Sequence, residues 1–372
     1  MSFAIAKLRI KFFLIIIFQL FILINLLYTS FSKVVLTESI FFSSINFILG
    51  LILLLDQTKK KSLLCFLLGL ALGSLIAIKP EGLVLLTGFL FQIFFFKKSN
   101  TKEKMILFVG IAIMPLFENI FYYEVHQKRE TVFKHVVKGK VFMIAGKSGE
   151  KFMKLPYFSE ELKKKIISKS SKVQEELSQL DNFYIRSKFL VDYEVLAQTK
   201  IKNILPNSFE EFNDEVEKNY LSIYFNLIYL FPVDYLKLTL NHYFMIWHPG
   251  VKILLKNEIN KIKSDILFYE AIKTTSGNVK QDLIFEEKKI LSLFSFLFLI
   301  YIIFSLYSLT KIFRSEEIAG FISYLILLTQ FHLIAVSLTN IGNFRYLLPN
   351  YSIIILSVIL FINLYLNKKI NT

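Results

Sequence analysis

The chain has 372 residues, of which 54% are hydrophobic, and its mean hydropathy is +0.53. Soluble domains average roughly 45–50% apolar residues, and the excess here lies in long runs of Phe, Ile and Leu, which excludes an ordinary soluble domain and predicts a protein with many membrane spans. The formal net charge is +15, but most basic residues lie where membrane topology requires them, so we expect no nucleic-acid partner.

Eight apolar segments are long enough, or nearly so, to cross a lipid bilayer, which takes about 20 residues. In chain order they cover 12–31, 40–56, 63–79, 82–96, 105–123, 290–310, 317–340 and 347–366. Lysine and arginine clusters stand before the first segment and after the second, fourth, sixth and eighth. Because basic residues in short loops stay cytoplasmic, we expect a multi-pass protein of the plasma (inner) membrane with both termini in the cytoplasm.

The remaining charged residues lie mostly between the fifth and sixth predicted spans. The expected fold is therefore an all-α polytopic membrane protein with three parts: a five-helix membrane bundle over 1–123, a mainly helical extracytoplasmic domain over 124–289, and a three-helix bundle over 290–372. Within the outer domain, "FPVDYLKLTLNHYFMIWHPG" begins near a proline and ends at Pro-Gly. Its Tyr, Trp and His residues suit an amphipathic helix in the lipid headgroup layer.

With this topology, ionisable and aromatic residues from separate segments come to the outer membrane surface. The candidate site residues are Glu38, Lys79, Glu81, Glu118, His248, Arg345 and Tyr346. Arg and Lys neutralise phosphate oxygens, and a carboxylate can act as a base or hold a divalent metal such as Mg²⁺ or Mn²⁺. The set therefore suits a substrate with a lipid tail and a phosphate.

Three of these candidate residues, Glu38, Lys79 and Arg345, also have a purely structural interpretation. Thr37 could cap a helix and place Glu38 in its first turn, beside the positive end of the helix dipole. The Lys79 side chain could extend to the membrane interface. Arg345 could anchor the chain to lipid headgroups.

The other polar residues of the predicted spans have structural interpretations too. Glu118 could pair with a neighbouring lysine, although ionisable residues within a span are functional candidates by default. His248 follows a tryptophan and could be an interfacial anchor. Gln330 and His332, in the seventh predicted span, are expected to form interhelical hydrogen bonds rather than a proton relay.

Three stretches resemble the GT-C superfamily of membrane glycosyltransferases, in particular its family 39-like members, the group of protein mannosyltransferases and lipid A aminoarabinose transferase. The stretches are "VVLTESIFFSSINFILGLILLL", "FLLGLALGSLIAIKPEGLVLLTGFL" and "NFRYLLPNYSIIILSVILF". The pattern is an acid after Leu-Thr, a Lys- or Arg-Pro-Glu-Gly turn, and Arg-Tyr-x-Leu-Pro at the start of a late helix. The likeness in motif covers only part of the chain.

This resemblance implies inverting transfer of a sugar from a polyprenyl-phosphate donor to a cell-envelope glycan, lipid or protein acceptor at the outer membrane face, as in lipopolysaccharide or glycan biosynthesis. It implies that Glu38 stands at the family's second-loop acid, on the side of a metal, the phosphate or the acceptor. Lys79 replaces the commoner arginine, which keeps the charge but loses bidentate geometry. Arg345 is implied to lie near the donor phosphate.

The sequence departs from that family near its beginning. Members start with a helix and an outer loop that carries the main catalytic Asp, whereas the first Asp here is Asp56, on the predicted cytoplasmic side. We expect that the first two helices and their loop are missing from this sequence or are supplied by a separate chain, or that Glu38 serves alone. In the first two cases the chain by itself would be inactive.

Two other functional classes stay open. The missing Asp would fit a non-enzymatic scaffold or a partner subunit of such a transferase. A lipid-glycan flippase or transporter would be expected to show inverted repeats and helices broken at mid-membrane, and neither pattern is visible in the sequence.

Overall fold

The computed structural model describes residues 13–16, 36–58, 61–79, 82–96, 100–126, 133–179, 183–247, 298–308, 317–340, 346–347 and 350–370. Within these ranges the chain is helical with connecting turns and no strand, which confirms the predicted all-α class. The chain divides into two compact units, of which the first comprises 1–129, 299–335 and 345–372 and the second 130–298 and 336–344. The inclusion of 336–344 in the second unit has no counterpart in the sequence-based division.

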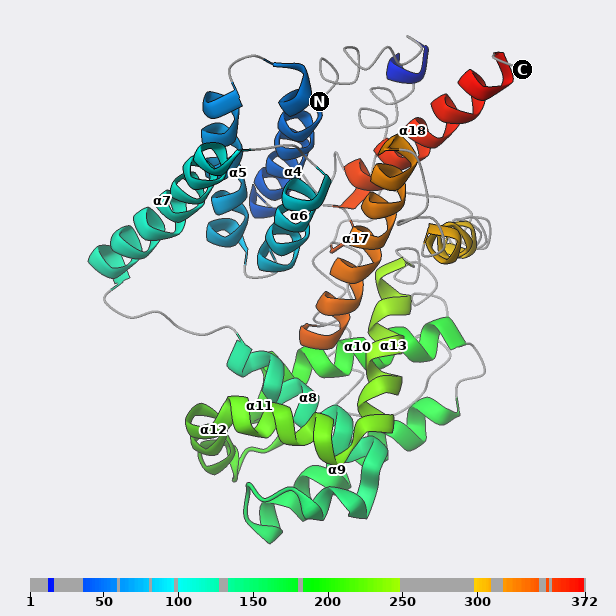
Figure 1. Cartoon of the computed structure of the whole chain (residues 1–372). Helices are drawn as coiled ribbons and strands as arrows, with labels where there is room; N and C mark the ends of the chain where they lie inside the picture. The colour runs from blue at the N-terminus through cyan, green and yellow to red at the C-terminus, as the bar shows by residue number, and fades with distance from the viewer. Residues whose placement is uncertain are drawn as a thin grey trace. The chain divides into compact units, whose positions relative to one another are not determined.

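The first unit is a bundle of apolar helices (Figure 1). They are α4 (Leu36–Leu54), α5 (Lys61–Ile78), α6 (Gly82–Phe96), α7 (Thr101–His126), an apolar helix at Phe298–Ser308, α17 (Glu317–Thr339) and α18 (Tyr351–Ile370). In the described part of the chain, two helices, Lys61–Ile78 and Gly320–Thr339, are long and apolar enough to cross a membrane. Four shorter apolar helices accompany them, and the total of eight spans stays a prediction.

The beginning of α7 has a clear local cause. The Asn100 side-chain oxygen accepts a hydrogen bond from the Glu103 backbone N–H at 2.8 Å, and the Glu103 carboxylate accepts one from the Asn100 N–H at 3.0 Å. This reciprocal capping box satisfies two backbone donors that a helix start leaves unpaired. The helix therefore begins at Thr101, four residues before the start expected from hydropathy alone.

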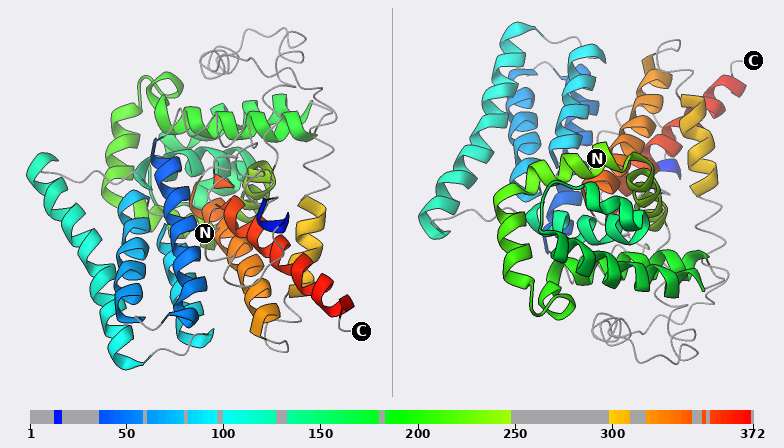
Figure 2. Two further views of the ribbon diagram at one scale, coloured as in Figure 1. Left: turned by 90° about the horizontal axis from the view of Figure 1, so that it is seen from above. Right: turned by 90° about the horizontal axis from the view of Figure 1, so that it is seen from below.

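Glycines allow α5 and α7 to pack closely along their length. A Cβ atom at Gly69 would lie 2.4 Å from the Leu107 carbonyl oxygen, and one at Gly73 would lie 2.5 Å from that of Ile111. Gly110 makes the matching approach from α7. Small residues spaced four apart permit this backbone contact between apolar helices. Figure 2 shows α4, α5, α6 and α7 side by side in both views.

The second unit is built around one buried helix. Its elements are α8 (Phe133–Ser148), a 3₁₀ turn at Gly149–Lys154, α9 (Glu160–Ser178), α10 (Phe183–Thr199), α11 (Ile201–Ile204), α12 (Phe209–Leu230) and α13 (Pro232–Trp247). Every residue from Val136 to Ala145 is buried, because α9, α10, α12 and α13 all pack against α8. A helix buried on every side is the centre of a domain rather than a surface element.

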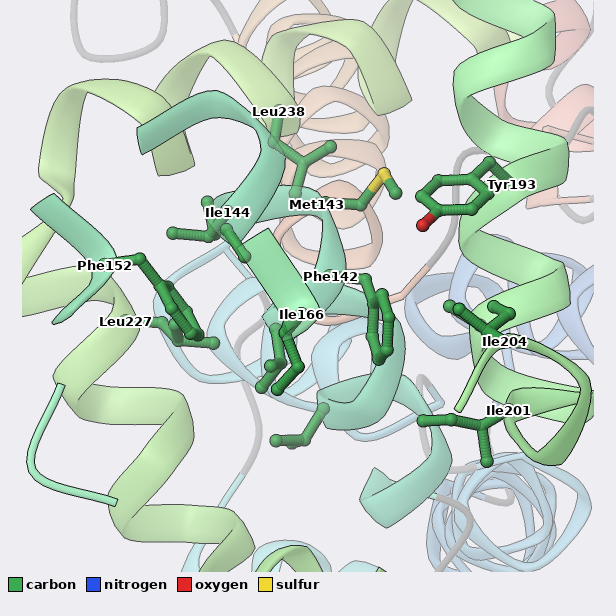
Figure 3. Close-up of a cluster of buried hydrophobic side chains, with 14 of the residues drawn as sticks. Phe142, Met143, Ile144, Phe152, Ile166, Tyr193, Ile201, Ile204, Leu227 and Leu238 are labelled. Carbon is green, nitrogen blue, oxygen red and sulfur yellow. The ribbon is translucent and has the colours of Figure 1, made fainter. Parts of the chain in front are cut away.

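Large side chains fill the space around α8. Figure 3 shows Phe142, Met143 and Ile144 of α8 among side chains from the surrounding helices. The Phe142 ring lies edge-on to the ring of Phe212, with centroids 5.6 Å apart, in the geometry that aromatic pairs prefer.

We expect Gly69→Ala to weaken the packing of α5 on α7, because the new methyl group meets backbone atoms that cannot move independently. Overpacking of this kind costs about 1–3 kcal/mol, and a fall in the unfolding midpoint of the purified protein in detergent would reveal it. Gly88→Ala is the control, because its Cβ would meet the end of the flexible Leu328 side chain. Equal midpoints for both variants would contradict the proposed close contact.

Candidate functional site

Lys79 lies immediately after α5, where it contacts residues of the other two segments singled out from the sequence. Its ammonium nitrogen is 5.9 Å from the ring centroid of Phe41 in α4 and 5.6 Å from that of Tyr346. Both distances fall within the range of cation–π contacts. The Lys79 side chain is half-buried, so the chain fold brings a cation and two aromatic rings together within the first unit.

The helix directions place two acidic residues at the same end of the bundle as Lys79. Contacts of α5 with α7 keep a nearly constant sequence offset, with Gly69 beside Leu107 and Gly73 beside Ile111, so these helices run parallel and Glu118 lies at the level of Lys79. α4 runs the opposite way and begins at this end. Glu38 is the third residue of α4, one helical turn before Phe41.

The beginning of α4 corrects one sequence-based interpretation. The helix already includes Leu36 and Thr37, so Thr37 is a residue of the first turn and the interpretation of Thr37 as the N-cap is wrong. Glu38 still lies in the first turn, where the helix dipole favours a negative charge.

The Tyr346 backbone is held by Asn350, whose side chain also contacts a buried histidine. The Asn350 side-chain nitrogen donates to the Tyr346 carbonyl oxygen at 3.0 Å and lies 2.9 Å from His332 Nδ1. Both Asn350 and His332 are fully buried. The His332 contact links α17 to the residue that precedes α18, as the prediction of an interhelical hydrogen bond requires.

Gln330 makes the other predicted interhelical bond. Its side-chain nitrogen donates to Ser305 Oγ at 2.8 Å, which joins α17 to the helix Phe298–Ser308. Three further candidates, Glu81, His248 and Arg345, lie outside the described residues. Their roles stay predictions, although Arg345 directly precedes Tyr346 in the sequence.

A shallow groove of about 520 Å³ runs between α4 and α5 below this end of the bundle. It is lined by Ile40, Ser43, Ser44, Phe47, Leu67, Leu70, Ala71, Ser74 and Met114. The α4 residues follow the helical period, starting one residue before Phe41. The groove is mostly apolar with three hydroxyl groups, a lining compatible with a lipid chain.

The second unit contains a buried charged cluster that the sequence analysis missed. Lys140 of α8, Glu194 of α10 and His242 of α13 are each at most 1% exposed. Lys140 Nζ lies 3.1 Å from Glu194 Oε1, and His242 Nε2 lies 2.7 Å from Glu194 Oε2. One carboxylate therefore contacts both a lysine and a histidine in the interior of the unit.

Burial and charge shift the pKa values of this cluster in a consistent direction. Burial lowers the pKa of His242, against the attraction of the Glu194 carboxylate. It also lowers the pKa of Lys140. For Glu194, burial acts to raise the pKa, but the contacts with His242 and Lys140 outweigh the effect of burial and the pKa is lowered. Because the pKa of His242 lies below its ordinary value of 6.5, its imidazole is neutral at neutral pH.

The helix α13 has one buried and one exposed face, but the sequence analysis placed its aromatic and histidine residues on the wrong face. Tyr235, His242 and Trp247 point into the second unit and are buried, so they are not at a lipid surface. The exposed face carries Val233, Leu236 and Leu240, which are 56–62% exposed. The aromatic and histidine residues that motivated the headgroup prediction are therefore core residues of this unit.

The described residues contain no group of three or more His, Cys, Asp or Glu side chains that could hold a metal ion, and the side chain of Glu38 is not among those described. Comparison of the chain with protein-family models, curated proteins and solved structures gave no match.

We expect the protein to lose stability as the pH falls below about 7. The His242 pKa is lower in the folded chain than its ordinary value of 6.5, so the unfolded chain takes up protons first and acid favours unfolding. The lowered pKa of Glu194 acts in the same direction at still lower pH. Thermal unfolding midpoints measured between pH 8 and pH 5 would give the slope of stability against pH.

His242→Asn keeps a polar side chain that does not titrate and should reduce this slope between pH 7 and pH 5. His135→Asn is the control, because His135 is exposed on α8. An unchanged slope in His242→Asn would contradict the assignment.

Proposed function

We propose that this chain takes part in transferring a sugar from a polyprenyl-phosphate donor to a cell-envelope acceptor at the outer face of the plasma membrane. The observation that carries the proposal is the position of Lys79 over the rings of Phe41 and Tyr346. This contact joins the three sequence segments that resemble the GT-C glycosyltransferases. Residues from three segments distant along the chain thus contribute to one location in the first unit.

Each residue of the proposed site has a defined task. Lys79 and Arg345 would neutralise the donor phosphate, which leaves with the electron pair of the broken bond between the sugar carbon and the phosphate oxygen. Glu38 would accept the proton of the acceptor hydroxyl as this oxygen attacks the sugar carbon from the opposite side. Attack from that side inverts the configuration at the carbon. Tyr346 would support the Lys79 ammonium with its ring.

Membrane location of the second unit is supported by an exposed apolar stripe. Leu221, Phe225 and Tyr229 of α12 are 49%, 63% and 82% exposed. The exposed face of α13 is also apolar. Contiguous apolar patches are rare on soluble surfaces and mark interaction sites with proteins or membranes. We propose that this stripe lies in the interfacial layer of a lipid bilayer.

The first test of the proposed function is the binding of decaprenyl phosphate to the purified protein in nanodiscs. We expect Lys79→Met to weaken binding about tenfold or more, because a hydrogen bond to a charged group contributes about 1.5–3 kcal/mol. Lys104→Met is the matched control, because Lys104 also lies over an aromatic ring, that of Phe94 at 5.1 Å. Equal affinities for the two variants would remove Lys79 from the site.

Transfer itself is tested with membranes that contain the chain and a radiolabelled polyprenyl-phosphate sugar. Glu38→Gln is expected to abolish incorporation of the label into envelope material while decaprenyl phosphate still binds. If Glu38→Gln and wild-type membranes incorporate label equally, Glu38 is not the base. If wild-type protein binds the lipid phosphate without transferring sugar, the partner-subunit function is favoured.

The membrane stripe can be tested by fluorescence. Trp247 is the single tryptophan, so Trp247→Phe gives a background in which Phe225→Trp, Leu236→Trp or Lys164→Trp reports one position. We expect lipids brominated near the headgroup end of their chains to quench the first two and to leave the third, on the polar face of α9, unchanged. Equal quenching at all three positions, or none, would contradict this orientation.

A further inference from the structure

Asn350 joins two parts of the first unit through one amide nitrogen. This nitrogen lies 3.0 Å from the Tyr346 carbonyl oxygen and 2.9 Å from His332 Nδ1. A carbonyl oxygen can only accept a hydrogen bond, so the atom of Asn350 that faces it is the amide nitrogen and not the amide oxygen. The Tyr346 carbonyl therefore determines how the Asn350 amide is oriented.

The orientation of Asn350 fixes the position of the proton on His332. An amide NH₂ group donates two hydrogen bonds and accepts none, so its second hydrogen goes to His332 Nδ1. This ring nitrogen must be without a proton, and the ring is neutral with its proton on Nε2. A doubly protonated ring would turn an N–H toward the Asn350 N–H, and the two donors would repel each other.

The second ring nitrogen makes His332 unfavourable as a purely structural residue. His332 is fully buried, and its Nε2 has no hydrogen-bond partner in the described part of the chain. A buried donor without an acceptor is destabilising, and a leucine at this position would remove that donor. What the histidine supplies in exchange is the acceptor for Asn350.

Tyr346 connects this contact to the candidate site. Its side chain is 4% exposed, so the ring has little freedom once the backbone is held. The ring centroid lies 5.6 Å from the Lys79 ammonium nitrogen, a distance at which an aromatic ring attracts a cation. The contacts thus run without a gap from His332 to Lys79 inside the first unit.

We propose that His332 and Asn350 are positioning residues that hold Tyr346 against Lys79 and so keep the Lys79 ammonium in place for a phosphate. The effect on phosphate binding rests on the function proposed above, whereas the protonation of His332 does not. The Lys79 ammonium stands on a flexible four-carbon stem, and ordering such a side chain during binding weakens the affinity. A side chain that is already held in place avoids this loss.

Two substitutions of His332 in the full-length protein separate positioning from direct contact with the ligand. His332→Asn keeps an acceptor near the place of Nδ1 but lacks the Nε2–H group, whereas His332→Leu lacks both. We expect His332→Asn to bind decaprenyl phosphate in nanodiscs like wild type. His332→Leu should bind about fivefold more weakly, which corresponds to about 1 kcal/mol. Equal weakening in both variants would assign the effect to Nε2–H and overturn the positioning role.

Gln330→Leu is the matched control. Gln330 also lies on α17, is also buried, and donates a hydrogen bond to Ser305 of another helix. That helix carries no residue of the candidate site, so the affinity should be unchanged. The unfolding midpoint of His332→Leu should fall no further than that of Gln330→Leu, because the unpaired Nε2–H is removed together with the acceptor. A much larger fall would assign His332 to general stability and overturn the positioning role.

A Tyr346→Leu background tests the path of the effect. Because the role acts through the Tyr346 ring, His332→Leu should cause no further loss of affinity in this background. Equal losses with and without the Tyr346 ring would show that His332 acts independently of it, and would overturn the positioning role.

The protonation of His332 is measured separately, by ¹⁵N nuclear magnetic resonance of histidine-labelled protein in nanodiscs. The chain has five histidines, and the His332 signals are those that His332→Leu removes. We expect the signals of a neutral ring with its proton on Nε2. A proton on Nδ1, in a neutral or a charged ring, would overturn the contact with Asn350 and the positioning role with it.

The two proposals fail in different ways. If wild-type protein does not bind decaprenyl phosphate, the proposed function is wrong and the positioning role fails with it, whereas the resonance experiment still decides whether His332 accepts from Asn350. If wild type binds and His332→Leu binds equally well, the proposed function stands and the positioning role is wrong.

Discussion

The second unit depends on a positive charge placed in its dry centre. Lys140 belongs to a helix that is buried on all sides, and an ammonium without a partner there would cost several kcal/mol. The cost is offset only if a carboxylate and a backbone carbonyl reach the same nitrogen, which Glu194 and Asn340 do. Three separate parts of the chain, α8, α10 and the end of α17, are thereby specified to meet at one atom.

This requirement explains why the short stretch 336–344 belongs with the second unit although the greater part of α17 belongs with the first. Apolar packing alone would leave the register of α17 loosely defined, since neighbouring turns of a helix offer similar surfaces. Directional bonds to Leu338 and Asn340 select one register. Buried polar contacts often contribute more to uniqueness than to stability, and the same division of roles fits here.

The sequence predicted what hydropathy and loop charge determine: an all-helical chain, most helix positions, and interhelical bonds for Gln330 and His332. It could not identify Lys140, because α8 also carries Lys134, Lys138 and Lys147, and no local pattern shows which of these lysines meets a buried carboxylate. The glycine that precedes Lys140 was the one available signal, since Gly139 marks a close helix contact.

The error about α13 has a related cause. Tyr, Trp and His are equally suited to a membrane interface and to the interior of a domain, where their polar atoms find partners. The side on which they lie depends on which face of α13 meets α8, and this is a property of the whole unit. Periodicity identified the two faces of the helix but could not assign them.

Under the proposed function, Lys79 stands where the GT-C members that the chain resembles more often have an arginine. A guanidinium binds phosphate through two parallel hydrogen bonds, whereas an ammonium acts as a point charge on a flexible stem. Aromatic rings attract a cation by about 0.5–1 kcal/mol at exposed sites and by about 2 kcal/mol when it is desolvated, whereas a hydrogen bond to a charged group contributes about 1.5–3 kcal/mol. Phe41 and Tyr346 can therefore hold Lys79 near its place and still let it move onto a ligand. Recognition of the phosphate at this position would then rest on charge, and geometric selection of the donor would fall to other residues, foremost Arg345.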